Sequence, residues 1–501
     1  MNILDAIQIR EADRYTIQQE PISSWNLMER ASGLFLNRLL QDFPDQTRFR
    51  ILCGAGNNGG DGLAVCRMLL ERGYTDTRCY LINQESYSRD NLFNQQLLSA
   101  YRPDSLQRFE DCLELPIEDD VLWIDALLGT GLNRAPEGFY HECIKWLNRR
   151  KLLISLDMPS GLFTDGITLH EFVHATKTYT FEAPKEGLLM PQHQVDFHVI
   201  PIGLNQAVFE YGEDRPVWYR TADIRNLKLK RQRHSHKGSY GHLLVVAGSK
   251  TKAGAAVMTV KAALRSGVGL VTILLPEQIR NTVMTQVPEA MCMIGGLDII
   301  TELPDFLPAS VDAIAAGPGL GTQEATGKII SELMQIFPDV PLLLDADALN
   351  LLAENKINIK FLNNRALLTP HPGEFKRLVG IWKDDLERLN LLSSFSLKEC
   401  CSIILKDTYS IYSNCKGHLS YHTGGNTGLA KGGSGDVLTG IIGGLLASGY
   451  QRNAAAALGL YLQGCAADIA CSRETADGMT AMSIIEALPE AWATLMIKTT
   501  L

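Results

Sequence analysis

The 501-residue sequence has no excess of positive charge and no long apolar run. It contains 47 Lys and Arg against 56 Asp and Glu, a formal net charge of −9. A non-specific nucleic-acid-binding protein needs surplus cations to neutralise phosphates, so this class is excluded. No stretch approaches the roughly 18 uninterrupted apolar residues of a membrane span, and charges between Arg10 and Arg14 interrupt any signal-peptide core. We therefore expect a cytoplasmic protein with no nucleic-acid or membrane partner.

Paired cysteines are also absent. The 11 cysteines are odd in number and scattered, and no two of them form a CxxC pair. A disulfide framework or a structural zinc site depends on such regular spacing. We expect neither, and read the cysteines as reduced, buried thiols.

The composition of the chain and its alternation of apolar runs and helical patterns favour two α/β domains. Hydrophobic residues make up 46% and charged residues 21%, as in folded soluble proteins. A chain of 501 residues is longer than a domain built around one hydrophobic core usually is. Short apolar runs alternate with glycine-rich turns and helical patterns, which predicts parallel sheets covered by helices on both faces. A charged, weakly periodic segment, residues 205–232, separates the halves, so we predict domains at 1–218 and 219–501.

The expected strands share an apolar character on both faces. In the first half they are Phe49–Cys53, Arg78–Ile82, Val121–Asp125, Leu152–Asp157 and Thr176–Phe181. In the second half they are Leu243–Ala247, Leu270–Leu274, Ala313–Ala316, Leu342–Asp345, Ala366–Thr369 and Ser402–Lys406.

The first half carries the glycine-rich segment Gly54–Gly62 between an expected strand and the helical pattern Leu63–Leu70. It satisfies GxGxxG, but a dinucleotide-binding loop also needs an acidic residue about 20 positions on, where this chain has only Asn83 and Gln84. Backbone amides at a helix N-terminus favour an anionic group. Asn57, Asn58 and Asp61 add oxygen ligands or hydrogen bonds. The alternative is a structural turn in which Asp61 only caps the helix.

Two more strand ends in this half carry acidic and glycine residues. Asp125 runs into Gly129–Ala135, and Asp157 runs into Pro159–Gly161. Ligands bind at the carboxyl ends of strands in open α/β sheets. Three such ends predict a convergent polar pocket.

The segments GAGNNGGDG, DALLGTGLNR and DMPSG together resemble the NAD(P)H-hydrate epimerases, over nearly all of residues 1–210. The resemblance implies a Rossmann-like three-layer α/β/α domain that interconverts the R and S hydrates at C6 of the reduced nicotinamide ring. The hydrate-binding residues that it implies are Asn57, Asn58, Gly59, Gly60, Asp61, Gly129, Thr130, Gly131, Leu132, Asn133, Arg134, Ala135 and Asp157. It also implies a potassium ion on Asn58, Asp125 and Ser160, whose oxygens suit a hard cation.

Epimerisation by ring opening, or by loss and return of the hydroxyl, needs a positioned acid or base. Asp157 is the candidate, because a carboxylate between a strand end and a pocket can be tuned by burial. The alternative is that Asp157 only accepts hydrogen bonds from the following turn.

The second half contains Asn426–Gly440, a glycine-rich loop followed by a helical pattern that begins at Val437. Amides of such a loop and the positive end of the helix dipole form an anion hole for a transferred phosphoryl group. Asp436 is placed to take a proton from an acceptor hydroxyl, and an N-cap role is compatible with this. The loop is not a Walker motif, because GxxxxGK[ST] does not occur.

Further segments of this half are Lys237–Gly238, Ala247–Ser249, Gly317–Gly321, Leu344–Asn350 and Thr369–Glu374. With GSGD they resemble the ADP-dependent NAD(P)H-hydrate dehydratases, a ribokinase-like branch with an α/β fold, across residues 230–495. The resemblance implies that the hydrate contacts Ala255, Gly319, His371 and Asp436. It implies that the adenine nucleotide contacts Lys406, Asp407, Thr408, Tyr409, Ser410 and Gly435.

The implied reaction is phosphorylation of the C6 hydroxyl of the S hydrate by ADP, followed by elimination of phosphate. It restores NAD(P)H and leaves AMP, and magnesium is expected to screen the diphosphate. Asp345 and Asp347 are candidates for secondary magnesium or network groups, or are structural. His371 lies between two prolines, so we expect a fixed ring without metal partners. The resemblance also implies a homo-oligomer that binds the hydrates and ADP as its small-molecule ligands.

Two positions depart from the family pattern. Asp407 follows the nucleotide-loop lysine, where glycine is usual, and Lys431 precedes GSGD, where a small hydroxyl residue is usual. A carboxylate beside phosphates is unfavourable unless it points away or binds through magnesium. The two charges either compensate each other or weaken nucleotide affinity.

Two rival functions stay open from the sequence. One is a small-molecule kinase, of hydroxymethylpyrimidine or sugar type, because the same Gly435 and Asp436 chemistry would serve it. The other is that the first half only binds or scaffolds, since domains of this kind can lose activity and keep the fold.

Overall fold

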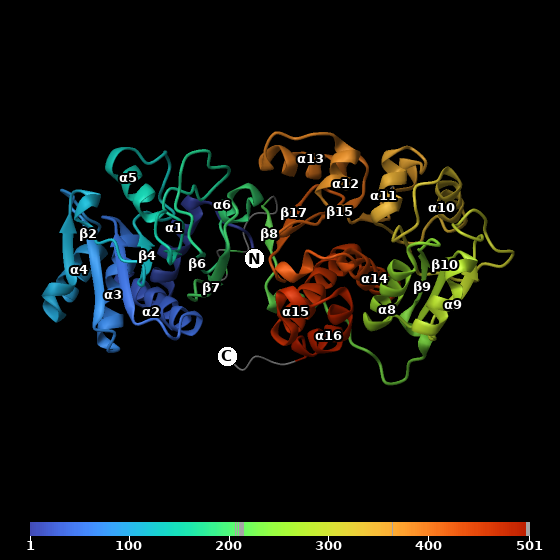
Figure 1. Cartoon of the computed structure of the whole chain (residues 1–501), viewed down its shortest axis with the longest axis horizontal. Coiled ribbons are helices and arrows are strands. Elements are labelled where there is room, and N and C mark those ends of the chain that lie inside the picture. The colour runs from blue at the N-terminus through green and yellow to red at the C-terminus, as the bar shows by residue number, and fades with distance from the viewer. Residues whose placement is uncertain (206, 208, 210–214, 363, 497–501) are drawn as a thin grey trace. The chain divides into compact units, whose positions relative to one another are not determined.

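The computed structural model describes residues 1–205, 207, 209, 215–362 and 364–496, and the chain divides into two units, Met1–Trp218 and Tyr219–Leu501 (Figure 1). Positions 206, 208 and 210–214 of the expected linker lie outside the described residues. The rest of that segment includes β8 (Val217–Trp218) and the helix α7 (Thr221–Leu227). The segment is therefore not free of secondary structure.

The first unit contains a seven-stranded sheet in the order β3-β2-β1-β4-β5-β6-β7, in which every neighbouring pair is parallel. Its strands are β1 (Arg48–Cys53), β2 (Asp76–Ile82), β3 (Leu106–Phe109), β4 (Leu122–Ala126), β5 (Leu153–Leu156), β6 (Lys177–Phe181) and β7 (Phe197–Ile200). Its helices are α1 (Ala6–Gln19), α2 (Ser24–Asp42), α3 (Asn57–Glu71), α4 (Arg89–Tyr101), α5 (Gly138–Leu147) and α6 (Glu186–Leu189). The order reverses between β1 and β4, where open α/β sheets bind ligands.

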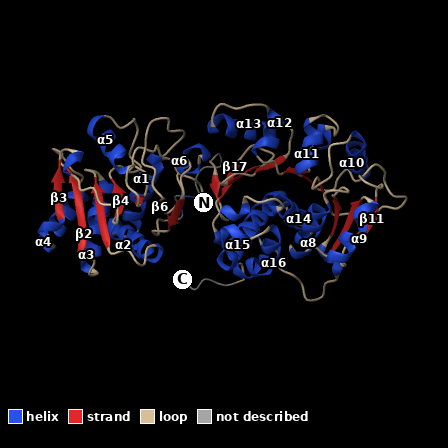
Figure 2. Ribbon diagram, in the orientation of Figure 1, coloured by secondary structure: helices blue, strands red, loops and turns tan. Residues whose placement is uncertain are grey.

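Side chains of each strand point alternately to the two faces of the sheet, and helices pack on both faces, so this unit has three layers. Ile51 of β1 belongs to a core with Phe35 of α2 and Leu63 of α3. Its neighbour Leu52 belongs to a second core, with Trp146 of α5. Successive strand residues face opposite sides, so helices cover both faces of the sheet (Figure 2). The Rossmann-like α/β/α fold is thus confirmed.

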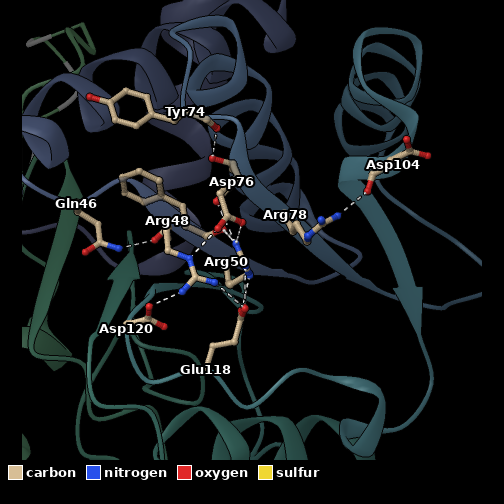
Figure 3. A network of polar contacts seen from close by, with 11 residues as sticks. Gln46, Arg48, Arg50, Tyr74, Asp76, Arg78, Asp104, Glu118 and Asp120 are labelled. Atoms are coloured by element: carbon tan, nitrogen blue, oxygen red, sulfur yellow. Dashed lines mark hydrogen bonds and ion pairs between the residues drawn. The ribbon is translucent and has the colours of Figure 1, made fainter.

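An ion-pair network joins the amino ends of β1 and β2 to the segment before β4 (Figure 3). Arg50 is only 3% exposed, and its Nε lies 2.6 Å from Glu118 Oε2. Arg50 Nη1 lies 2.9 Å from Asp76 Oδ1, and Arg48 Nε lies 2.7 Å from Asp76 Oδ2. A buried guanidinium is tolerated only with such partners. The network belongs to the edge of the sheet opposite the strand carboxyl ends.

The second unit contains strands in the order β11-β10-β9-β12-β13-β14-β15-β16-β17. They are β9 (His242–Val246), β10 (Leu270–Leu275), β11 (Met291–Ile294), β12 (Ala313–Ala316), β13 (Leu342–Leu344), β14 (Ala366–Leu368), β15 (Ser402–Leu405), β16 (Ser410–Ser413) and β17 (Leu419–His422). Neighbours up to β15 are parallel, but β15, β16 and β17 pair antiparallel. The expectation of a wholly parallel sheet is corrected for this hairpin. The strand order reverses between β9 and β12.

Helices cover both faces of this second sheet. They are α7, α8 (Ala253–Arg265), α9 (Glu277–Gln286), α10 (Glu324–Ile336), α11 (Ala346–Ala353), α12 (Pro372–Val379), α13 (Asp385–Lys398), α14 (Ser434–Ala447), α15 (Arg452–Gly478) and α16 (Ala481–Thr494). The core on one face combines α8, α14, α15 and α16 with Val245 and Ala315 of the sheet. The helices α11, α12 and α13 lie on the other side of the strands (Figures 1 and 2).

Among the described residues one helix, α15, is long and apolar enough by length and composition to cross a membrane. Of its most apolar window, 67% is buried inside the unit. Buried residues such as Leu458 and Leu462 belong to the same core as α14 and α16. Packing in this core accounts for the apolar character of α15.

Candidate active sites

A cavity of about 990 Å³ lies in the first unit. Its walls are formed by the segments that follow β1 and β4, by Asp157 after β5, and by α1. Of the expected hydrate-binding residues, those that line it are Asn57, Asn58, Asp61, Gly129, Thr130, Gly131, Leu132, Asn133, Arg134, Ala135 and Asp157. The cavity therefore brings together three strand ends at the point where the strand order reverses.

The helix α3 begins six residues earlier than its apolar pattern indicates, at Asn57 with Gly56 as N-cap. Asn57, Asn58 and Asp61 thus belong to its first turns, and Asp61 is not the cap. A Cβ on Gly54 would lie 1.9 Å from the carbonyl oxygen of Leu127, so only glycine fits where this turn meets the next loop. The start of α3 brings its unpaired backbone N–H groups to the cavity.

Gly59 and Gly60, two of the expected hydrate-binding residues, pack inside the unit. Gly59 lies against the backbone of Gly54, where a Cβ would meet the carbonyl oxygen at 1.8 Å. Gly60 lies against the Met28 side chain, where a Cβ would be 3.0 Å from Sδ. Both are buried, and their contact with the hydrate stays a prediction.

Asn58, which lines the cavity, and Ser160 both contact the Leu128 backbone, and Ser160 in turn contacts Asp125. Ser160 Oγ donates to Asp125 Oδ1 at 2.5 Å, and the Ser160 N–H donates to Asp125 Oδ2 at 2.8 Å. Asn58 Nδ2 donates to the carbonyl oxygen of Leu128 at 2.9 Å. Asn58 Oδ1 is buried and has no hydrogen-bond partner among the described residues. The orphaned amide oxygen of Asn58, linked through Leu128 to the Ser160 hydroxyl and the buried Asp125 carboxylate, provides with them the oxygen donors that a hard monovalent cation prefers.

Asp157 is held in an unusual backbone conformation, with φ +63°, in the left-handed region. Its Oδ1 accepts from Lys185 Nζ at 2.7 Å and from the Phe181 N–H at 3.1 Å. Lys185 is buried, and its Nζ also donates to Thr180 Oγ1 at 2.7 Å. Asp157 Oδ2 accepts no hydrogen bond from a described residue and is left to the cavity. Strained residues of this kind cluster at functional sites.

Three further carboxyl groups line the same cavity, those of Asp13, Asp61 and Glu137. Burial, reinforced by the Asp157 charge, raises the pKa of Asp61 well above its ordinary value. Ser32 Oγ donates to Asp61 Oδ1 at 3.2 Å. Burial and then the Asp157 charge raise the pKa of Asp13 to about 7, against the opposing effect of Lys185.

In the second unit the helix α14 begins at Ser434, three residues before the expected start, and its N-cap is Gly433. Gly433 has φ +97°, a conformation that favours glycine. Asp436 is therefore in the first turn and is not the cap. Burial, then the charge of Asp345, raises the pKa of Asp436 to about 6, while Lys406 lowers it. Its carboxyl group accepts no hydrogen bond from a described residue.

Lys406 follows β15, which is far from α14 in the sequence, but its side chain lies at the start of this helix. Its Nζ is 2.7 Å from Asp345 Oδ1, and Thr439 Oγ1 donates to Asp345 Oδ2 at 2.6 Å. A Cβ on Gly435 would be 3.4 Å from Lys406 Nζ. The structure thus brings together Lys406, Gly435 and Asp436 around the buried Asp345.

Two expected hydrate contacts, Ala255 and Gly319, are neighbours at the reversal between β9 and β12. A Cβ on Gly319 would be 3.1 Å from Ala255 Cβ and 3.0 Å from Lys252 Cβ. Lys252 Nζ is 3.0 Å from Asp347 Oδ2, which also accepts from the Gly321 N–H at 2.7 Å. Asp347 is thus a network group that fixes the glycine loop.

His371 is the N-cap of α12, and its Nδ1 accepts from the Gly373 N–H at 3.0 Å. The Glu374 carboxylate accepts from the backbone N–H of His371 at 2.9 Å, but the His371 side chain is 53% exposed, so the fixed ring stays a prediction. The Lys406 N–H donates to the carbonyl oxygen of Pro370 at 2.9 Å, which brings this loop beside the lysine. Thr408, Tyr409 and Ser410 lead from Lys406 into β16, and their nucleotide contact stays a prediction.

Both departures from the family pattern have a local explanation. Asp407 Oδ2 lies 2.5 Å from Nη1 of Arg388, a buried guanidinium of α13. Lys431 Nζ donates to the carbonyl oxygens of Asp477 at 2.5 Å and Met479 at 2.6 Å. These charges are therefore partnered within the protein, and the idea that they compensate each other directly is not needed.

Sequence reasoning missed several residues of the two sites, among them Asp13, Lys185 and Lys252. Lys185 follows β6, so the rule of strand carboxyl ends would have found it. Asp13 shares a helix face with Ile9 and Ile17, at a spacing of four, and all three line the cavity. A charged residue in the middle of an apolar stripe is the signal that would have marked it.

A family model described as NAD(P)H-hydrate dehydratase matches residues 243–490, and one described as YjeF-related protein N-terminus matches residues 24–187. Two curated relatives are each named bifunctional NAD(P)H-hydrate repair enzyme Nnr. That of Moorella thermoacetica is 33% identical over 516 residues, covering 98% of this chain and 96% of the relative. That of Escherichia coli is 33% identical over 494 residues, covering 96% and 92%.

A solved structure of a ribokinase-like superfamily protein from Enterococcus faecalis is similar to the second unit. It has a TM-score of 0.50 and 23% identity, and the match covers 57% of this chain and 98% of that chain. At this level of identity the similarity bears on the fold alone. The ribokinase-like fold expected for the C-terminal domain is confirmed.

Proposed function

The chain belongs to the family of bifunctional NAD(P)H-hydrate repair enzymes, and we propose that its two sites share one repair pathway for hydrated NADH and NADPH. The first unit interconverts the R and S hydrates, and the second dehydrates the S form with ADP, giving NAD(P)H, AMP and phosphate. The observation that carries the proposal is the coexistence of the Asp157 cavity with the Gly433–Asp436 turn in one chain.

In the first unit the hydrate occupies the cavity, with its phosphates near the start of α3 and the Gly129–Ala135 loop. Asp157 acts as acid or base at C6, through the oxygen that Lys185 does not occupy. The ammonium of Lys185 fixes the carboxylate in its strained position. An additional binding role for Gly59 and Gly60 follows from their place in the same turn.

Potassium fits the group beneath this cavity. Asn58 Oδ1, Asp125 and Ser160 Oγ would hold it, because the amide oxygen lacks any other partner among the described residues. A bound cation supplies fixed positive charge beside the loops that meet the substrate. It also offsets the cost of burying the Asp125 carboxylate.

In the second unit the hydrate contacts Ala255, Gly319, His371 and Asp436. The nucleotide contacts Lys406, Asp407, Thr408, Tyr409, Ser410 and Gly435. Asp436 takes the proton of the C6 hydroxyl, and the amides at the start of α14 stabilise the transferred phosphoryl group. Phosphorylation converts hydroxide, a poor leaving group, into phosphate, a good one. Transfer of its terminal phosphoryl group converts ADP into AMP.

Magnesium is the expected companion of the diphosphate, because it neutralises charge that the protein does not. The described residues contain no group of three or more His, Cys, Asp or Glu arranged to hold a metal. Asp345 is already engaged by Lys406 and Thr439, and Asp347 by Lys252 and Gly321. We therefore infer that the ion binds chiefly through nucleotide oxygens, with these carboxylates as a network around it.

The test is recovery of the near-ultraviolet absorbance of NADH from a mixture of both epimers, with magnesium and either ADP or ATP. Complete recovery with ADP supports both activities. A plateau near the share of the S epimer means that the first unit does not epimerise, which revives the binding-module alternative. A phosphorylated product that persists, instead of AMP and phosphate, overturns dehydration in favour of a small-molecule kinase.

The same proposal gives the protein a cytoplasmic location and a homo-oligomeric state. Hydrated NAD(P)H forms where the reduced cofactors are used, and the chain has a net charge of −9 without a surplus of cations. Fractionation of cells and light scattering of the purified chain test the two points. NADH or NADPH preference follows from relative rates on the two hydrates.

A further inference from the structure

One carboxyl group of the first cavity has no part in the reaction described so far. Asp13 lies in α1, and it lines the cavity together with Ile9 and Ile17 and with the polar residues Arg10, Arg14 and Gln18 of the same helix. The two isoleucines flank the carboxyl group by one helical turn on each side. The aspartate is therefore the only acidic residue that the described part of α1 contributes to the cavity wall.

The surroundings of Asp13 leave its carboxyl group uncommitted. It accepts no hydrogen bond from a described residue, whereas Asp157 and Asp61 each accept at least one. Lys185, the buried cation of the cavity, is engaged by Asp157 Oδ1, Thr180 Oγ1 and the Phe181 carbonyl oxygen. Asp13 is half-buried, and a carboxyl group that lines a cavity without a hydrogen-bond partner is characteristic of functional sites.

The other charged residues that line the cavity are Arg10, Arg14, Asp61, Arg134, Glu137, Asp157 and Lys185. Burial and the facing charge of Asp157 raise the pKa of Asp13 to about 7, which Lys185 opposes. At neutral pH Asp13 thus exists in both forms and can donate or accept a proton.

We propose that Asp13 is the second catalytic group of the epimerase site, acting on the ring nitrogen while Asp157 acts on the C6 hydroxyl. This rests on the proposed function of the first unit. It gives a role to the Asp13 carboxyl group, which lines the same cavity as Asp157 but has no contact with Lys185 corresponding to that of Asp157. Cleavage and closure of a hemiaminal need a base at one atom and an acid at the other.

The bonds balance in this scheme. The carboxylate of Asp157 takes the proton of the C6 hydroxyl, the oxygen forms a carbonyl, and the C6–N1 bond breaks with its electron pair going to nitrogen. The protonated carboxyl group of Asp13 delivers its proton to N1. After rotation about the C5–C6 bond, N1 attacks the other face of the aldehyde, returns its proton to Asp13, and Asp157 returns its proton to the oxygen. Nothing is oxidised or reduced.

The experiment uses the full chain with the Asp13→Asn substitution, which keeps size and removes proton transfer. The matched control is Glu11→Gln, an exposed carboxylate on the same helix that does not line the cavity. Interconversion of separated R and S hydrates is followed without nucleotide, and the rate without protein is subtracted. ADP-dependent dehydration of the pure S hydrate, carried out by the second unit, reports on the integrity of each variant.

We expect Asp13→Asn to lower kcat for epimerisation by about 100-fold or more, with little change in KM, and Glu11→Gln to leave both unchanged. Dehydration stays normal in both. Because the native pKa of Asp13 exceeds the ordinary 3.8, the unfolded chain loses this proton first, so the folded state loses stability between about pH 4 and pH 7 and carries the full penalty above that range. Asp13→Asn should therefore raise the unfolding midpoint of the first unit at about pH 8, and not at about pH 4.

Each result decides a different point. If the unsubstituted chain does not interconvert the epimers, the proposed function of the first unit fails. If it does so and Asp13→Asn retains full kcat, the role of Asp13 is wrong and the epimerase assignment stands. A rise in KM alone would make Asp13 a binding residue and would equally overturn the acid role.

Discussion

Lys406 Nζ lies 2.7 Å from Asp345 Oδ1, and this pair joins the carboxyl ends of β15 and β13 across the strand between them. Asp345 is 1% exposed, so its charge is tolerated through Lys406 and the Thr439 hydroxyl. The pair aims the lysine at the first turn of α14, where Gly435 has no side chain to displace it. The lysine that we propose contacts the nucleotide is thus held in place by the protein's own side chains.

Replacement of Asp436 by Asn should abolish dehydration and spare epimerisation. The amide keeps the size of the side chain but cannot take a proton from the C6 hydroxyl, a loss of about 10² to 10⁴ in rate. NADH recovery from the pure S hydrate with ADP measures it. Interconversion of the epimers by the same preparation is the internal control. Retention of more than about a tenth of the dehydration rate would contradict a base role for Asp436.

The pH dependence of dehydration should follow the ionisation of Asp436. Burial and the neighbouring Asp345 raise its pKa to about 6, and a base must be ionised to act. The rate at limiting S hydrate should therefore rise with pH through about 6 and level off above it. The measurement is kcat/KM between about pH 5 and pH 8. A profile that falls over this range would mean that a protonated group is required instead.

Sequence patterns anticipated the sheets and the glycine-rich strand ends, because apolar runs and glycines report directly on buried strands and tight turns. They misplaced the starts of α3 and α14. Asn57–Gly62 and Ser434–Asp436 lack the apolar periodicity by which a helix is recognised, although both segments are helical. The first turn of each helix faces a candidate site and is therefore polar, so the sequence pattern does not reveal that it is helical.

Other features depend on partners far apart in the chain and could not be read locally. Asp407 and Arg388 are 19 positions apart, and only tertiary packing brings them to 2.5 Å. The β16–β17 hairpin was missed because its strands are short and carry Ser, Tyr and His in place of a continuous aliphatic run. Asp13 was missed because no glycine or strand end marks it.

Potassium should stabilise the first unit through Asn58. Its buried Oδ1 has no partner among the described residues, so a cation bound there favours the folded state. At a concentration about 100-fold above its dissociation constant, the ion would add about 2.7 kcal/mol. The unfolding midpoint of the first unit is compared in potassium and in tetramethylammonium chloride at equal ionic strength. Asn58→Leu should remove the difference; if that variant still responds to potassium, the ion binds elsewhere.

The Arg50 network should contribute to the stability of the first unit and not to its chemistry. Arg50→Met removes a buried guanidinium that Glu118 and Asp76 both contact, although both carboxylates keep Arg48 as a partner (Figure 3). Because Asp76 is 42% and Glu118 is 24% exposed, we expect a loss below the roughly 3 to 5 kcal/mol of a fully buried pair, and a lower unfolding midpoint. Arg78→Met on the neighbouring strand is the control, since Arg78 is exposed. Epimerisation by the folded fraction should be unchanged, and an equal loss in the Arg78 variant would refute the burial argument.

Asp407 should contribute more to the stability of the second unit than to the binding of the nucleotide. If its carboxylate repelled the ADP phosphates, the family-like change Asp407→Gly would lower the KM for ADP. The structure argues against such repulsion, because Asp407 Oδ2 is paired with the buried Arg388 at 2.5 Å. Among the described residues, glycine would leave that guanidinium with Asp385 as its ion-pair partner, 3.0 Å away. We expect a lower unfolding midpoint for the second unit and a KM for ADP within about twofold of the original. Asp407→Asn, which keeps a hydrogen-bond acceptor, should lose less stability. A clear fall in KM with unchanged stability would mean that the carboxylate faces the nucleotide and that Arg388 does not neutralise it.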